Sequence, residues 1–155
     1  MIIYFNSHYG PYGYLSNLAP YDIKIDGYNW RTVEHYFQAQ KFAGTPYANF
    51  IQKVKKPQVA QRLGNEMDWP KRADWTEVQE AIMKAAILEK FASHANIRRQ
   101  LLRTGNAILV ESAPTDYYWG SGADGSGKNR MGRILMDVRT ELQKERLSPI
   151  GRITA

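Results

Sequence analysis

The segment T-V-E-H-Y-F-Q-A-Q-K, residues 32–41, sets the helical character of this chain. Thr32 is a residue type that commonly caps a helix N-terminus, because its hydroxyl can accept from a first-turn N–H group. Gly44 offers a stop, so we expect the helix to run to about Ala43. Within it, polar and aromatic residues follow separate lines at helical spacing.

Glu34, Gln38 and Lys41 form the polar line of this helix. A helical lysine leans toward the N-terminus, so the Lys41 amine could approach the Glu34 carboxylate. An ordinary interpretation is a solvated face with helix pairing. Four aromatic residues close in sequence argue against a solvated face: Trp30, Tyr36, Phe37 and Phe42. A carboxylate and an amine among such residues would have shifted pKa values, as acid–base and Schiff-base chemistry require.

Around this helix the pattern predicts an α+β fold, a single compact, mostly helical domain with a small β portion. The domain is expected to span residues 1–147, with a loose tail at 148–155. Asp26-Gly27 is a hairpin turn signal between two short strands. The strands are expected at 2–5, 21–25, 28–30 and 107–110. Helices are expected at 46–55, 57–64, from the capping-box sequence at 74–77 onward, at 96–103, and after the glycine-rich loop at 119–128.

Composition limits the classes of protein that remain. The 155 residues carry 21 Lys+Arg and 15 Asp+Glu, a formal charge of +6, which is a weak indication of an anionic partner. The absence of cysteine excludes disulfides, thiol nucleophiles and thiolate metal sites. No signal peptide is visible, and no apolar run approaches the roughly 20 residues that span a bilayer. We therefore expect a cytoplasmic location.

A glycine-rich loop is the second candidate site. Residues 122–128 fit the pattern G-x-x-x-x-G-K, but Asn129 follows where a phosphate-binding loop needs Ser or Thr for Mg²⁺, so an NTPase is rejected. Glycines before a helix could still bring N–H groups to an anion, or they could only shape a surface loop. Asp116 and Trp119 beside the loop would suit a ribose or a base.

The three histidines show no helical pairing, so structural roles are favoured and no metal site is predicted. Trp75, at the start of the long helix, could stack on a base.

Together these motifs resemble the NADAR (YbiA-like) family. The similarity rests on Phe5-Asn6-Ser7, the segment 13–17, the helix segment 34–41, and W-G followed by G-K-N-R-M-G at 127–132. It extends from about Ile3 to Leu142. The resemblance implies a compact α+β domain with N-glycosidase activity and no cofactor. One departure is Ser121, where some members carry an acidic residue.

By this resemblance Glu34, Lys41 and Asp116 are the candidate catalytic residues. The candidate substrate-binding residues are Asn6, Ser7, Asn17, Trp75, Trp119, Gly120, Gly127, Lys128 and Asn129. The family implies two substrate classes: ADP-ribose on the amino group of guanine, free or in nucleic acid, and phosphorylated ribosylaminopyrimidine or ribosylamino-uracil intermediates of riboflavin synthesis. Some members act as antitoxins, which leaves a toxin partner open.

Two mechanisms and one further class of function stay open. In the first mechanism, Lys41 displaces the base through a Schiff base while Glu34 moves protons. In the second, Glu34 activates water, Asp116 stabilises the positively charged sugar, and Lys41 binds phosphate or ribose. The other class is a non-catalytic module that binds ADP-ribose or nucleic acid.

Overall fold

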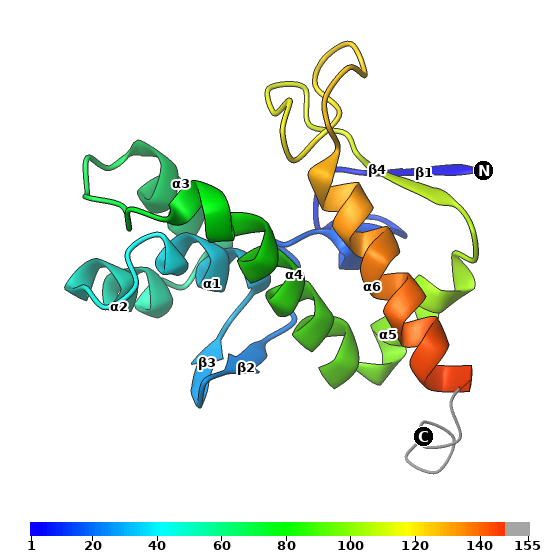
Figure 1. The fold of residues 1–155 in the computed structure, drawn as a ribbon, viewed down its shortest axis with the longest axis horizontal. Coiled ribbons are helices and arrows are strands. Elements are labelled where there is room, and N and C mark those ends of the chain that lie inside the picture. The colour runs from blue at the N-terminus through cyan, green and yellow to red at the C-terminus, as the bar shows by residue number, and fades with distance from the viewer. Residues whose placement is uncertain (148–155) are drawn as a thin grey trace. The chain divides into compact units, whose positions relative to one another are not determined.

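A computed structural model describes residues 1–147 of the chain. The predicted α+β class, mostly helical with small sheets, is confirmed (Figure 1). The prediction of a loose tail at 148–155 lies outside the described residues. In chain order the elements are β1 (Ile2–Phe5), the 3₁₀ turn η1 (Gly13–Leu15), β2 (Ile23–Ile25), β3 (Tyr28–Trp30), α1 (Val33–Gln40), α2 (Pro46–Lys53), α3 (Pro57–Glu66), α4 (Trp75–Ser93), α5 (Ala95–Arg103), β4 (Ile108–Glu111) and α6 (Arg130–Leu147).

The chain forms two compact units, each described by itself. Of the described residues, one unit combines Met1–Ser16 with residues 94–147. Its sheet is a parallel pair of β1 and β4, with Ile2 opposite Ile108. Helix α6 packs on β4 and on α5, and its buried side chains are Met131, Ile134, Leu135, Val138, Arg139 and Leu142. The single-domain prediction for 1–147 stays a prediction.

The other unit, Asn17–Ser93, is organised around α1. Helices α2, α3 and α4 all pack against α1. The predicted hairpin is present as the antiparallel pair β2–β3, with Ile25 opposite Tyr28. Asp26 and Gly27 have φ values of 53° and 81°, the conformation that this two-residue turn requires.

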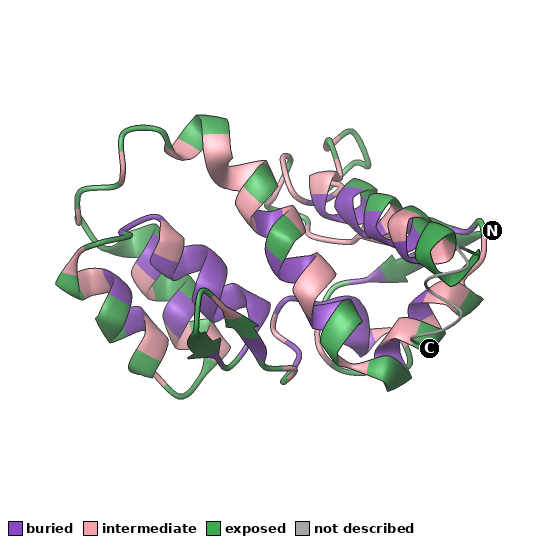
Figure 2. Ribbon diagram, turned by 60° about the horizontal axis from the view of Figure 1, so that its bottom comes forward, coloured by how far each residue is buried: buried purple, intermediate pink, exposed green. Residues whose placement is uncertain are grey.

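Because α1 is surrounded by helices, its polar residues are buried together with its apolar ones. Seven of its eight residues are buried, so Figure 2 draws it almost wholly in purple. Thr32 caps it as predicted, since the side chain accepts from the His35 N–H group. The helix ends at Gln40, three residues before the predicted end, where the Phe42 N–H donates to the Ala39 carbonyl and tightens the last turn.

The start of α4 also differs in detail from the expectation. The capping-box pattern predicted that the Asp74 side chain would cap the helix. In the structure both of its carboxylate oxygens accept from Arg72, at 2.6 Å from Nε and 3.1 Å from Nη2. A stronger, charge-assisted partner two residues away therefore holds this carboxylate.

Within residues 1–147 no helix combines the length and apolar character needed to cross a membrane.

His35 has the structural role that the sequence favoured. The ring is fully buried, with Nδ1 2.8 Å from the Thr32 hydroxyl and Nε2 2.9 Å from the Val54 carbonyl. A carbonyl only accepts, so Nε2 carries the proton and Nδ1 accepts from Thr32. This neutral ring ties the start of α1 to the residue after α2.

Burial lowers the pKa of His35 below its ordinary value, and this gives a prediction for stability. The unfolded chain takes up a proton at this ring at a higher pH than the folded chain does. We therefore expect the free energy of unfolding to decrease as the pH falls through about 6.5, the ordinary histidine value. Urea unfolding at pH 7.5 and 5.0 measures the free energy of unfolding at the two pH values. His35→Gln should flatten the pH dependence, and His94→Gln should not; equal slopes in both variants would contradict the assignment.

Candidate active site

Glu34 lies in the first turn of α1 and is 5% exposed. Its backbone N–H donates to the Asn17 carbonyl at 3.2 Å. Its Oε1 accepts from Gln38 Nε2 at 2.7 Å, one helical turn further along. The amide thus fixes the rotamer of a buried carboxylate, and a carboxylate held in this way is suited to proton transfer with a bound molecule.

Lys41 immediately follows α1 and is also 5% exposed. Its Nζ donates to the Gly64 carbonyl at 3.2 Å and to Asn65 Oδ1 at 2.9 Å. The ring centroids of Phe37 and Trp75 lie 5.8 Å and 5.9 Å from Nζ. The amine therefore sits between aromatic rings and the C-terminal end of α3.

These surroundings lower the pKa of Lys41 to about 8. Burial is the largest cause, because it disfavours the charged amine, and the positive charge of Lys71 acts in the same direction. The negative charge of Glu34 raises the pKa and only partly offsets them. A substantial fraction of Lys41 is thus neutral near pH 8, and a neutral amine is the nucleophilic form.

The interpretation of the polar line as a solvated face is wrong, since Gln38 as well is only 3% exposed. The suggested approach of the Lys41 amine toward Glu34 stays a prediction, and the negative charge of Glu34 raises the pKa of Lys41. Both hydrogen bonds found for the Lys41 amine lead to α3, where Gly64 and Asn65 accept from it. Sequence reasoning missed both partners, because nothing in the pattern of α3 distinguishes them.

Gly64 makes room for Gln38. A side chain at position 64 would collide with the Gln38 amide, since an added Cβ would meet its Oε1 and Cδ atoms. Among the described residues Gln38 Oε1 is buried and has no hydrogen-bond partner. α3 therefore supports both candidate catalytic residues: it holds Lys41 directly, and it leaves the space in which Gln38 reaches Glu34.

Two predicted binding residues lie in the same unit. The Trp75 ring packs against the Phe37 ring, with centroids 5.0 Å apart, and is partly exposed. Asn17 is buried, and its Nδ2 donates to Met83 Sδ at 3.4 Å. The structure thus places Trp75 beside Lys41 and connects Asn17 to Glu34 through its backbone carbonyl.

Asp116 and Trp119 lie in the other unit and share one turn. Asp116 Oδ1 accepts from the Tyr118 and Trp119 N–H groups at 3.0 Å and 2.8 Å. The carboxylate therefore shapes the loop that carries Trp119. Its proposed effect on a sugar stays a prediction.

Of the two alternatives for the glycine-rich loop, the hydrogen bonds of residues 127–131 favour glycines that shape the loop. The N–H groups of residues 127–131 all donate to carbonyls of the same loop, at 2.7–3.0 Å. Gly120 and Gly127 serve this folding, because a Cβ at either position would collide with neighbouring atoms of residues 113 or 120–121. These five N–H groups are therefore not available to a phosphate. Lys128 remains as a charged side chain, with its amine 5.6 Å from the Tyr118 ring centroid.

The Asn129 side chain makes two hydrogen bonds that join parts of the fold. Its Oδ1 accepts from the Glu111 N–H at 3.0 Å, and its Nδ2 donates to the Leu109 carbonyl at 2.9 Å, so the amide clamps β4 to the start of α6. In the same unit Asn6 is exposed at the end of β1, and the Ser7 hydroxyl accepts from the Tyr9 N–H at 3.3 Å. Their roles toward substrate stay predictions.

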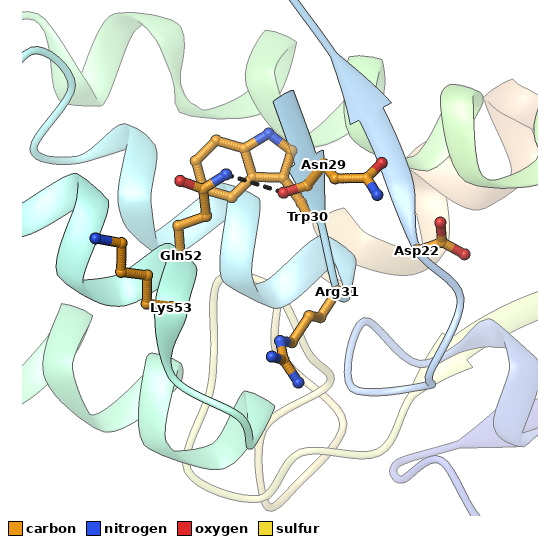
Figure 3. A pocket seen from close by; sticks show the side chains of 6 residues that line it. All are labelled: Asp22, Asn29, Trp30, Arg31, Gln52 and Lys53. Carbon is orange, nitrogen blue, oxygen red and sulfur yellow. Dashed lines mark hydrogen bonds between the residues drawn. The ribbon is translucent and has the colours of Figure 1, made fainter. Parts of the chain in front are cut away.

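A surface hollow of about 360 Å³ lies beside β3 and α2. Figure 3 shows the side chains that line it, and Gln52 Nε2 donates there to the Asn29 carbonyl at 3.0 Å. The lining residues are Asp22, Asn29, Trp30, Arg31, Gln52 and Lys53. None of them belongs to the predicted site.

Within residues 1–147, no three histidine, aspartate or glutamate side chains are grouped so that they could hold a metal ion. The expectation that the protein works without a cofactor stays a prediction.

Comparison with known proteins identifies the family to which this chain belongs. The NADAR domain family model matches residues 4–143, which includes segments of both units. The chain belongs to the NADAR family.

Individual members of the family indicate the class of enzyme. The chain is 46% identical to the N-glycosidase YbiA of Escherichia coli (strain K12) over 145 residues, which cover 94% of this chain and 91% of that protein. It is 45% identical to an N-glycosidase of Nostoc punctiforme, over 92% of this chain and 94% of that one. The solution NMR structure of Escherichia coli YbiA superposes with a TM-score of 0.87 and covers 95% of this chain and 88% of that one. The predicted family and the predicted enzyme class, an N-glycosidase, are confirmed.

Proposed function

We propose that this enzyme hydrolyses the bond between ribose C1 and an exocyclic amine, and that it removes ADP-ribose from guanine bases. The observation that carries the proposal is the pair on α1. A buried carboxylate, Glu34, and a buried amine with a pKa of about 8, Lys41, lie less than two helical turns apart. The rings of Phe37 and Trp75 beside the amine suit a base or a sugar.

In the favoured mechanism the C1–O4 bond of the glycosylamine breaks, the proton on the exocyclic nitrogen moves to O4, and C1 forms an imine with the nitrogen of the base. The neutral Lys41 amine adds to C1, and both of its protons move in turn to the leaving nitrogen by way of Glu34. The base departs as its free amine and leaves C1 bound to Lys41 as an imine. Water then adds to C1, releases the sugar as an aldehyde and restores the lysine. The sum is ADP-ribosylated guanine plus water giving guanine plus ADP-ribose.

The alternative mechanism uses water directly. The C1–N bond would break as water adds to C1, Glu34 would take the proton from that water and pass it to the departing nitrogen of the base, and Asp116 would stabilise the oxocarbenium-like sugar. Lys41 would then act as an ammonium ion that binds phosphate or ribose. The two mechanisms require opposite protonation states of Lys41, so they predict opposite pH dependence.

A second substrate class has a specific observation in its favour. Two relatives are riboflavin biosynthesis proteins, one from Vibrio vulnificus at 38% identity and one from Zea mays at 36%. The matched segments cover only 39% and 25% of those longer proteins, whereas the N-glycosidases match over almost their full length. We therefore place phosphorylated ribosylamino-pyrimidines and -uracils second. A non-catalytic binding module is set aside because the chain belongs to an enzyme class.

Parallel incubation distinguishes the substrates. Wild-type protein is mixed with guanine-ADP-ribosylated DNA and, separately, with a phosphorylated ribosylamino-uracil, and chromatography follows the released product. We expect release of ADP-ribose from DNA at a rate at least about tenfold above that of the free metabolite, a difference of about 1.4 kcal/mol in transition-state binding. The reverse order would assign the second substrate class, and release from neither would contradict the proposal.

A further inference from the structure

Among residues 1–147 the Lys41 amine has two hydrogen-bond acceptors, and both lie at the end of α3. The Gly64 carbonyl accepts at 3.2 Å and Asn65 Oδ1 at 2.9 Å. Gly64 is buried, whereas Asn65 is exposed. The buried amine is thus held by two neighbouring residues of α3, through a backbone carbonyl and a surface amide. No part of the motif on α1 that resembles the family includes either residue.

The number of acceptors matches the neutral form of the lysine. An ammonium ion has three N–H donors, whereas a neutral amine has two donors and one lone pair. Two acceptors occupy both donors of the neutral amine and leave the lone pair as the remaining direction. We propose that Asn65 is a positioning residue, which holds the neutral Lys41 amine by one N–H so that the lone pair is oriented for attack. This inference rests on the proposed function of Lys41.

An uncharged acceptor is what this position requires. The charged groups that act on the amine are Glu34, which favours its protonation, and Lys71, which opposes it. A carboxylate at position 65 would add a second negative charge, 2.9 Å from Nζ in the present geometry, and would favour the ammonium ion. An asparagine accepts the same hydrogen bond without that charge, so Asn65 leaves the amine both oriented and free to be neutral.

The test replaces Asn65 with Asp, which keeps the shape and adds the charge. The titration of the Lys41 Nζ is followed by NMR with labelled lysine, which needs no substrate. We expect Asn65→Asp to move the titration midpoint upward by about one unit or more. Gln61→Glu is the matched control, because it adds the same charge on an exposed position of α3, and it should move the midpoint far less.

Activity supplies the second readout. In Asn65→Leu the acceptor is lost and kcat should fall by about 10- to 100-fold. The melting temperature should hardly change, because the side chain is exposed. In Asn65→Asp the pH–rate profile should move upward together with the titration.

The possible results distinguish the inference about Asn65 from the proposed function of Lys41. A midpoint in Asn65→Asp no higher than in Gln61→Glu would overturn the inference about Asn65, and so would an unchanged kcat in Asn65→Leu. If the midpoint moves while the pH–rate profile stays in place, Asn65 controls the amine as inferred, but the reaction does not depend on the protonation of Lys41. That result would count against the proposed function alone.

Discussion

Glu34→Gln should lower kcat by about 10²- to 10⁴-fold, the usual contribution of a general acid or base. The change is nearly isosteric, and the new amide oxygen can still accept from Gln38 Nε2, as Glu34 Oε1 does at 2.7 Å. The position should therefore keep its hydrogen bond while losing its ability to move a proton. Initial rates of base release and equilibrium binding of substrate measure the two effects separately.

Glu66→Gln is the control, since Glu66 is an exposed glutamate at the end of α3 in the same unit. It should leave kcat unchanged. We expect Glu34→Gln to bind substrate with a Kd within about threefold of the wild type, a difference below about 1 kcal/mol. A variant that binds normally and still turns over at the wild-type rate would remove Glu34 from the mechanism.

Lys41→Met should lower kcat on the order of 10³-fold if the amine forms the imine. Methionine fills a similar volume and makes favourable contacts with aromatic rings, so the packing against Phe37 and Trp75 should survive. Lys55→Met, at an exposed position after α2, is the control and should leave activity unchanged. If Lys41 only binds phosphate or ribose, the same variant should mainly raise KM.

The two mechanisms for Lys41 predict opposite changes of kcat/KM with pH. The pKa of Lys41 is about 8, so the neutral nucleophile becomes more abundant as the pH rises toward and past that value. In the imine mechanism kcat/KM should increase with pH and level off above about 8. In the mechanism with direct attack by water, the ammonium ion is the active form, and kcat/KM should fall above about 8.

Local sequence signals predicted the elements that depend on local chemistry. Asp26-Gly27 produced the hairpin because both residues adopt positive φ there. Thr32 capped α1 for an equally local reason. The parallel pairing of β1 with β4 was not predicted, since these strands are about a hundred residues apart and no local pattern encodes their partnership.

In the candidate site, too, the features that depend on local sequence could be predicted and those that depend on long-range contacts could not. Glu34 and Lys41 could be selected from spacing and aromatic neighbours within one helix. The acceptors of the Lys41 amine could not, because they come from a helix that packs on α1 only after folding. The sequence left two alternatives open for the glycine loop, because glycines can free N–H groups for an anion or allow the loop to bond them itself. In the structure the N–H groups of residues 127–131 donate to carbonyls of the loop.

Asn129 illustrates how a motif residue can serve the fold. Its side chain bonds the backbone of Glu111 and Leu109, and its φ of 51° starts α6 from a left-handed conformation. A requirement for asparagine here follows from these bonds, because its amide both donates and accepts and asparagine tolerates this conformation. A role of Asn129 toward substrate would need the same amide to have a second function.

The most direct measurement of the central claim is reductive trapping at Lys41. Wild-type enzyme is mixed with substrate in the presence of borohydride, and mass spectrometry of its peptides locates any sugar attached to the chain. We expect one stable adduct, on Lys41, that is lost in Lys41→Met and retained in Lys55→Met. The contradicting result is the absence of any adduct from an actively turning-over enzyme, together with substantial turnover in Lys41→Met.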